Sequence, residues 1–134
     1  MPLVRIELIK GRSETDLLAI GNSIHRALVE CLNVPERDHF QVITEHSTRR
    51  LLYDSGYLGI ERTDGIIFVQ VFLSTGRTTQ QKKAFYARVA SLLASEARVA
   101  PGDATIVLVE NTREDWSFGH GCAQYLELPP EQWK

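Results

Sequence analysis

Two spacings of apolar residues alternate along the first half of the chain, and each spacing predicts a different element. Residues 1–8 have the composition and order of a β-strand. Apolar residues then return every three or four positions across 14–32, which predicts one amphipathic helix. The apolar run at 40–44 predicts a second strand, and the polar, glycine-containing segment 46–64 predicts a long loop or a small hairpin.

The second half of the chain repeats this order. An almost continuous apolar run at 65–73 predicts a third strand, and residues 105–109 predict a fourth. Between them, Thr78 and Gln81 have the spacing of a capping box, so a second helix is expected to begin there. The first helix has a similar signal, with Ser13 as N-cap and Asp16 expected to reach back to it.

The two halves match each other when the sequence is shifted by 65 positions, without a gap. Equivalent positions at this one register include Val4 with Val69, Arg12 with Arg77, and Asp38 with Asp103. The chain is therefore predicted to be a tandem β-α-β repeat of the α+β class. We expect repeats at about 2–45 and 67–110, a C-terminal tail at 111–134, and one domain over residues 1–134.

Two copies of one unit are expected to associate about a pseudo-twofold axis, which pairs their first strands antiparallel. The result is a four-stranded mixed sheet with both helices on one face. Pro2 then lies near 74–77, although more than seventy residues separate them in sequence. Because the third strand is apolar on both of its sides, we expect partner subunits to cover the other face of the sheet.

Composition narrows the class of protein. A hydrophobic content of 43%, a charged content of 24%, a net charge of −2 and a pI near 6.1 are typical of a globular protein that binds neither nucleic acid nor an anionic membrane. No apolar run reaches the roughly 20 residues that span a bilayer, and no secretory signal is recognisable. Cys31 and Cys122 are expected to be free thiols, which favours a cytoplasmic location.

Pro2 and Arg77 are the first candidates for chemistry. If Met1 is removed, Pro2 carries a free secondary amine, and α-amino groups titrate near neutral pH, at about 7.7–8.0. Arg77 precedes a helix N-terminus and is suited to bind a carboxylate. Alternatives stay open, because Met-Pro starts are common and Arg12 occupies the equivalent turn. Asp38 is equally open to a structural role, since Asp103 matches it.

Other residues are weaker candidates for a functional role. The four histidines lack the spacing of metal ligands, and no phosphate-binding loop is present, so neither a metal nor a cofactor is expected. Trp116 and Phe118 stand between glycines after the last strand. They predict either closure of the core or the lining of a pocket.

The chain resembles the tautomerase superfamily, whose members use an amino-terminal proline on a β-α-β repeat. The resemblance runs from Pro2 to about Leu128. Its most specific parts are the start Met1-Pro2-Leu3, the turn at 34–38, Gly76-Arg77, and residues 109–111 leading into 115–119. This last stretch is similar to the malonate semialdehyde decarboxylase branch.

The resemblance implies a role for each candidate residue. Pro2 would be the catalytic acid or base, and Asp38 would act on the substrate carbonyl or on a water. Arg77 would bind the substrate carboxylate, and Trp116 and Phe118 would line the pocket. One departure concerns substrate binding: Thr75 stands where the best-known decarboxylase pattern has a first arginine. The resemblance also implies a homotrimer.

Three functions follow as expectations. The first is decarboxylation of a small 3-oxo acid to an aldehyde and carbon dioxide, with Pro2 as a cation. The second is enol–keto tautomerisation of a 2-oxo acid of the phenylpyruvate type, with Pro2 as a neutral amine. The third is a non-catalytic trimer that binds small carboxylates.

Overall fold

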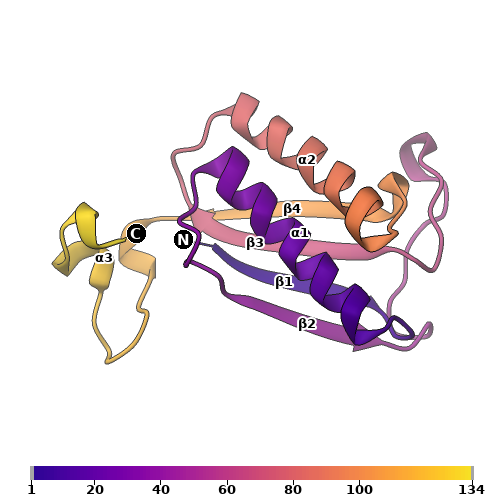
Figure 1. Ribbon diagram of the computed structural model, residues 1–134, viewed down its shortest axis with the longest axis horizontal. Helices are drawn as coiled ribbons and strands as arrows, with labels where there is room; N and C mark the ends of the chain where they lie inside the picture. The colour runs from indigo at the N-terminus through magenta and orange to yellow at the C-terminus, as the bar shows by residue number, and fades with distance from the viewer. Residues whose placement is uncertain (1, 134) are drawn as a thin grey trace.

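The computed structural model describes residues 2–133 and contains one four-stranded sheet with two long helices (Figure 1). The strands follow the order β2-β1-β3-β4 across the sheet. The elements are β1 (Pro2–Ile9), α1 (Glu14–Leu32), β2 (Gln41–His46), β3 (Ile67–Ser74), α2 (Thr79–Ala97), β4 (Ala104–Asn111) and the short α3 (Gln124–Glu127). The predicted mixed sheet and both predicted long helices are confirmed. The segment predicted as a loop or hairpin holds only a short 3₁₀ turn, Tyr57–Gly59, among its described elements.

Within each β-α-β unit, the two parallel strands pair in the same register. β1 pairs parallel to β2 with Val4 beside Gln41, and β3 pairs parallel to β4 with Val69 beside Ile106. Both pairs of positions are related by the shift of 65. The central pair, β1 with β3, is antiparallel and brings Pro2 opposite Leu73. This pairing relates the units by a pseudo-twofold axis and places the start of each unit's first strand beside the end of the other's.

The turns from strand to helix are also equivalent in the two units. Gly11 and Gly76 have φ values of 129° and 124°, a conformation in which a side chain would be strained. Thr78 and Gln81 form the predicted capping box at the start of α2. The capping box predicted for α1 is only half right. The Ser13 hydroxyl accepts from the Asp16 backbone N–H, but the Asp16 carboxylate binds Arg98 at 3.2 Å instead of reaching back.

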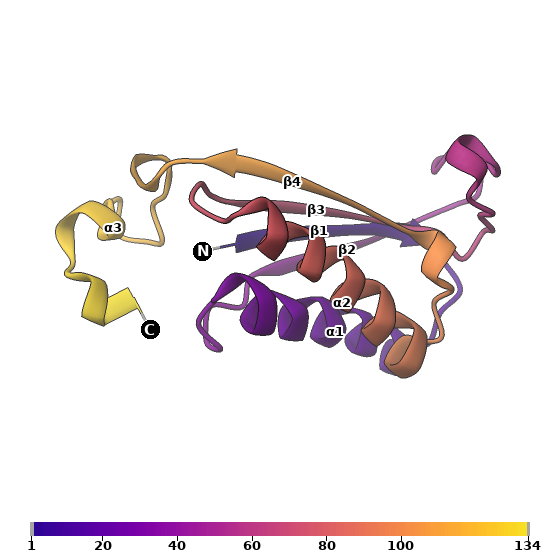
Figure 2. The same ribbon diagram turned by 90° about the horizontal axis from the view of Figure 1, so that it is seen from above.

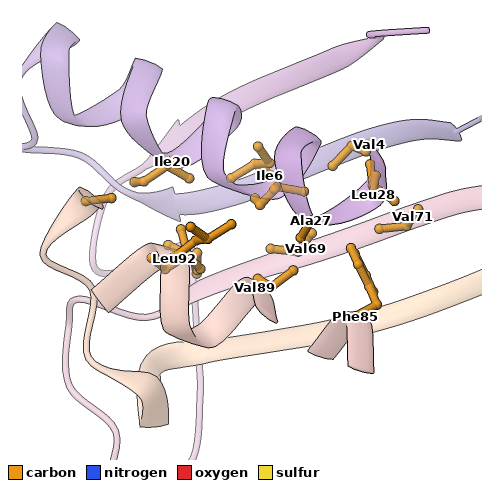
Figure 3. Close-up of a cluster of buried hydrophobic side chains, with 14 of the residues drawn as sticks. Val4, Ile6, Ile20, Ala27, Leu28, Val69, Val71, Phe85, Val89 and Leu92 are labelled. Carbon is orange, nitrogen blue, oxygen red and sulfur yellow. The ribbon is translucent and has the colours of Figure 1, made fainter. Parts of the chain in front are cut away.

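The core lies between the sheet and the helices (Figure 3). Its largest fully buried side chains come from β1, α1, β3 and α2, and include Ile6, Ile24, Ile67, Phe85 and Leu93. Each such side chain contributes about 1.5–3 kcal/mol of burial free energy. Arg88 of α2 also binds Glu30 of α1 at 2.7 Å, which joins the two helices at their exposed edge.

Both helices cover the same face of the sheet and leave the other face open (Figure 2). The open face carries apolar side chains, among them Leu3, Val42, Val107 and Val109, which are between 36% and 47% exposed. The tail after β4 extends beyond the end of the sheet at which β1 begins, and the loop before β3 extends beyond the opposite end (Figures 1 and 2). None of the described helices is long and apolar enough to cross a membrane. Cys31 and Cys122 are free thiols, as predicted.

Candidate active site

Pro2 is the first residue of β1, and its side chain is buried. On one side it is paired with Leu73, one residue before the end of β3. On the other side, the backbone N–H of Val4 donates to the carbonyl of Phe40 at 3.0 Å, in the segment that leads into β2. The parallel register therefore carries the segment 38–40 past Pro2. Met1, whose removal would free the Pro2 amine, lies outside the described residues.

Asp38 occupies this segment between α1 and β2, and it is partly buried. Burial raises the pKa of its carboxyl group above the ordinary value, while the charges of His25 and Arg77 act in the opposite direction. A carboxyl group whose pKa is raised in this way is suited to exchange a proton. The interaction with Arg77 also shows that the two predicted site residues lie near one another.

Arg77 follows Gly76 in the turn between β3 and α2, and it is half-buried. Its Nε and Nη2 donate to the carbonyl oxygen of Leu32, at 3.2 and 3.1 Å, and its Nη1 donates to the carbonyl oxygen of Ser74 at 3.0 Å. The guanidinium thus stabilises the C-terminus of α1 and is held in one orientation. Burial lowers the pKa of Arg77, and Tyr125, Asp38 and Glu110 raise it. An arginine has five N–H donors, so these three bonds leave donors for a substrate.

Two neighbouring cavities adjoin these residues. The first has a volume of about 360 Å³ and is lined by Asp38, Phe40 and Phe118, among others. The second has a volume of about 470 Å³ and is lined by Thr75, Arg77 and Arg113, among others. Tyr125 and Trp133 of the tail line both cavities and lie between them. Pro2 is not among the lining residues of either cavity.

The tail is held together by a series of aromatic contacts. The rings of Trp116 and Phe118 are stacked with centroids 5.7 Å apart, and Phe118 meets Tyr125 edge to face at 5.0 Å. Tyr125 in turn meets Trp133 edge to face at 4.9 Å. The tail also binds β4, because the Trp116 indole N–H donates to the side chain of Asn111 at 2.6 Å. Of the two predicted lining residues, Phe118 lines the first cavity, whereas Trp116 lines neither cavity and is stacked on Phe118.

Three residues of the tail were missed by sequence reasoning: Arg113, Tyr125 and Trp133. Burial raises the pKa of Tyr125 to about 12, with a further contribution from Asp38. Tyr125 is therefore a neutral phenol at physiological pH, with a hydroxyl that can donate a hydrogen bond. A signal for the two aromatic residues was present in the sequence, since aromatic residues recur in a tail that has no counterpart in the repeat.

The opposite end of the sheet holds the pseudo-equivalent set of residues. Arg12 donates from Nη2 to the carbonyl of Gly65 at 2.6 Å. Asp103, which is only 3% exposed, accepts from the backbone N–H of Thr63 at 2.7 Å and from its hydroxyl at 2.6 Å. The chain that enters β3 therefore fills the space between Arg12 and Asp103. Among residues 2–133, no group of three or more His, Cys, Asp or Glu side chains could hold a metal ion.

Comparison with protein families relates the chain to known enzymes. A family model described as tautomerase enzyme matches residues 38–119, and a second with the same description matches residues 2–54. The chain is also 46% identical over 127 residues to probable tautomerase YusQ of Bacillus subtilis (strain 168), covering 95% of this chain and 100% of that protein.

Solved structures give the same result. A malonate semialdehyde decarboxylase superposes with a TM-score of 0.89 at 29% identity, covering 93% of this chain and 96% of that one. A second malonate semialdehyde decarboxylase, inhibited by 3-bromopropiolate, gives a TM-score of 0.88 at 38% identity, covering 93% of this chain and 95% of that one. A trimeric fused 4-OT shares the fold, with a TM-score of 0.74 at 19% identity, covering 93% of this chain and 98% of that one. The chain therefore belongs to the tautomerase family, in the branch that resembles malonate semialdehyde decarboxylase, and it is an enzyme of the isomerase or lyase class.

Proposed function

We propose that this enzyme uses the N-terminal amine of Pro2 as an acid or base on a small oxo-carboxylic acid bound by Arg77. The observation that carries the proposal is that Pro2, Asp38 and Arg77 are grouped at one end of the sheet. A half-buried Arg77 and a partly buried Asp38 influence each other's pKa there, beside the strand that begins with Pro2. The role of Pro2 requires removal of Met1.

Decarboxylation of a 3-oxo acid is the reaction that we favour, because both decarboxylase structures match this chain over nearly its whole length. Arg77 holds the carboxylate, and the protonated amine of Pro2 donates a hydrogen bond to the 3-oxo group. The bond between the carboxylate carbon and C2 breaks, and its electron pair moves into the enolate as carbon dioxide leaves. C2 then takes a proton from Pro2, which yields the aldehyde. Pro2 recovers its proton from solvent.

Within this proposal, Asp38 and Tyr125 act on the oxo group or on a water next to it. Asp38 is the group that can exchange a proton, because burial raises the pKa of its carboxyl group. Tyr125 stays protonated and supplies a neutral donor. Thr75 lines the cavity of Arg77 and adds a hydroxyl without a charge. Phe118, with Trp116 stacked on it, limits the access of water.

Tautomerisation of a 2-oxo acid is the second candidate, and one observation favours it. Thr75, in the turn after β3, supplies no second cation next to Arg77, so the substrate carboxylate is polarised less strongly. In this reaction Pro2 is a neutral base, which takes a proton from the enol oxygen and then gives a proton to C3, so that the amine is neutral again. The name of the YusQ relative points to the same reaction class. A third candidate, a trimer that binds carboxylates without turnover, has no observation of its own in favour.

We also propose that three copies associate through the open face of the sheet. The apolar side chains on that face are the support from this chain, and a fused 4-OT of the same fold is a trimer. A cytoplasmic location is part of the same proposal and rests on the two free thiols.

A proton NMR assay tests the reaction. Malonate semialdehyde incubated with the enzyme should give acetaldehyde, and the absence of acetaldehyde would reject the decarboxylase. Phenylpyruvate enol, followed by ultraviolet absorbance, tests the tautomerase in the same preparation. The intact mass of the protein must first show that Met1 has been removed, since its retention blocks the amine.

A further inference from the structure

The cavity next to Arg77 has a second cation that the mechanism above does not use. Arg113, in the turn after β4, lines this cavity together with Arg77. Its guanidinium carbon lies 4.7 Å from the centre of the Trp133 ring, which holds it by a cation–π contact. The guanidinium of Arg113 makes no hydrogen bond or ion pair with another described residue, so its N–H groups are available to a ligand.

The positive charges of the arginines at this cavity are not matched by acidic side chains in its lining. Of the described residues that line it, Arg77 and Arg113 are charged and none is acidic. Glu110 near Arg77 is already bound to Lys82 at 2.7 Å. Asp115 accepts from the backbone N–H and the hydroxyl of Thr112, at 2.8 and 3.0 Å.

Two further side chains, Tyr125 and Glu114, do not neutralise the positive charge of this cavity. Tyr125, which lies against both cavities, is neutral because burial raises its pKa to about 12. Glu114 lines an adjoining hollow, which shares Ser74, Thr75 and Arg113 with the cavity of Arg77, but it does not line that cavity. Asp38, whose charge acts on Arg77, lines the neighbouring cavity and not this one. The lining of the cavity thus contains two guanidinium groups and no carboxylate.

Two cations on one small cavity favour a ligand with two anionic groups. A charge-assisted hydrogen bond from a guanidinium to a carboxylate is among the stronger polar contacts in proteins. The volume of about 470 Å³ is ample for a three- or four-carbon acid. We propose that Arg113 is a specificity residue, and that it selects small oxo acids with two carboxylate groups over those with one. This inference rests on the proposed function for the oxo acid, but the binding preference itself does not depend on turnover.

A binding experiment with two matched probes tests it. Calorimetric titrations at neutral pH would compare malonate, with two carboxylates, and propionate, with one. The wild-type protein should bind malonate about tenfold more tightly than propionate. Arg113→Gln should remove most of this preference by weakening malonate alone, and Arg113→Lys should keep most of it. Arg49→Gln, in the exposed loop after β2, should leave both affinities unchanged.

The proposal is overturned if wild-type protein binds the two probes equally, or if Arg113→Gln weakens both to the same extent. Failure of the proposed function would look different. Malonate semialdehyde and phenylpyruvate carry one carboxylate each, so oxaloacetate, a four-carbon oxo acid with two, is assayed beside them. A protein that turns over none of the three, yet shows the preference and loses it in Arg113→Gln, supports the role of Arg113 and rejects the reaction.

Discussion

The two ends of the sheet carry equivalent arginine and aspartate residues but differ in what lies between them. At one end, Arg12 and Asp103 are bound to the chain that enters β3, through Gly65 and Thr63. At the other end, Arg77 and Asp38 adjoin two cavities, and the side chains between these cavities come from the tail.

This difference separates what the fold requires from what a site requires. A Gly-Arg turn after the first strand and an aspartate before the second strand occur in both units, so their presence alone serves the fold. Arg77 even keeps a structural role, because it binds the carbonyl of Leu32 at the end of α1. What distinguishes its end is unfilled space, a partly buried carboxyl group and the start of β1. This difference is the reason that we propose chemistry at only one end of the sheet.

The largest expected effect comes from replacing the two arginines in parallel. Arg77→Gln should lower kcat/KM by about 100-fold, because a donor aimed at the reacting carboxylate is lost. Arg12→Gln should leave kcat/KM within about twofold and cost about 1 kcal/mol of stability, through the lost hydrogen bond to Gly65. Steady-state kinetics and urea denaturation of both variants provide the comparison. Equal losses of activity in the two variants would contradict the assignment.

Replacement of the two aspartates should also have different effects. The loss of activity is expected at Asp38, where it should be smaller than at Arg77, and the loss of stability is expected at Asp103. Asp38→Asn should lower kcat/KM by at least about tenfold, since a group that exchanges protons is removed. Asp103→Asn should cost about 2 kcal/mol of stability, because a buried carboxylate with two donors from Thr63 loses an acceptor. Activity of the Asp103 variant, measured where it remains folded, should stay near that of the wild type.

The smallest effect is a pH-dependent difference in stability at Asp38. Burial raises the folded-state pKa of Asp38 above its unfolded value, so ionisation favours unfolding. The stability associated with the protonated carboxyl group is fully present below the unfolded pKa and is lost as pH rises through the folded pKa. Asp38→Asn should therefore have a higher Tm than the wild type at pH 7, and the difference should vanish near pH 3. A lower Tm for this variant at pH 7 would contradict the account.

Most of the fold could be predicted because the signals for it are local or repeated. The periodicity at 14–32 matches α1 over its whole length, and the shift of 65 gave the pairing that brings Pro2 opposite Leu73. The capping box of α1 was half wrong for a non-local reason. Arg98, distant in sequence, binds Asp16, and nothing near Ser13 indicates this contact.

Only those residues of the candidate site that belong to the repeat could be predicted from the sequence. Arg77 and Asp38 have counterparts in the other unit, so the symmetry of the sheet placed them at one end. Arg113, Tyr125 and Trp133 have none. Their positions depend on contacts between aromatic rings within the tail, which neither periodicity nor a repeat predicts.

The most direct test of the central claim is a titration of the Pro2 nitrogen by NMR in protein labelled with ¹⁵N-proline. We expect one titrating proline nitrogen. Its pKa should be about 6 for a tautomerase or above about 8 for a decarboxylase. Arg77→Gln should change this pKa, because it removes a neighbouring positive charge, and Arg12→Gln should not. The absence of a titrating proline nitrogen, or a pKa that responds to neither or equally to both replacements, would contradict the claim that this end of the sheet is the active site.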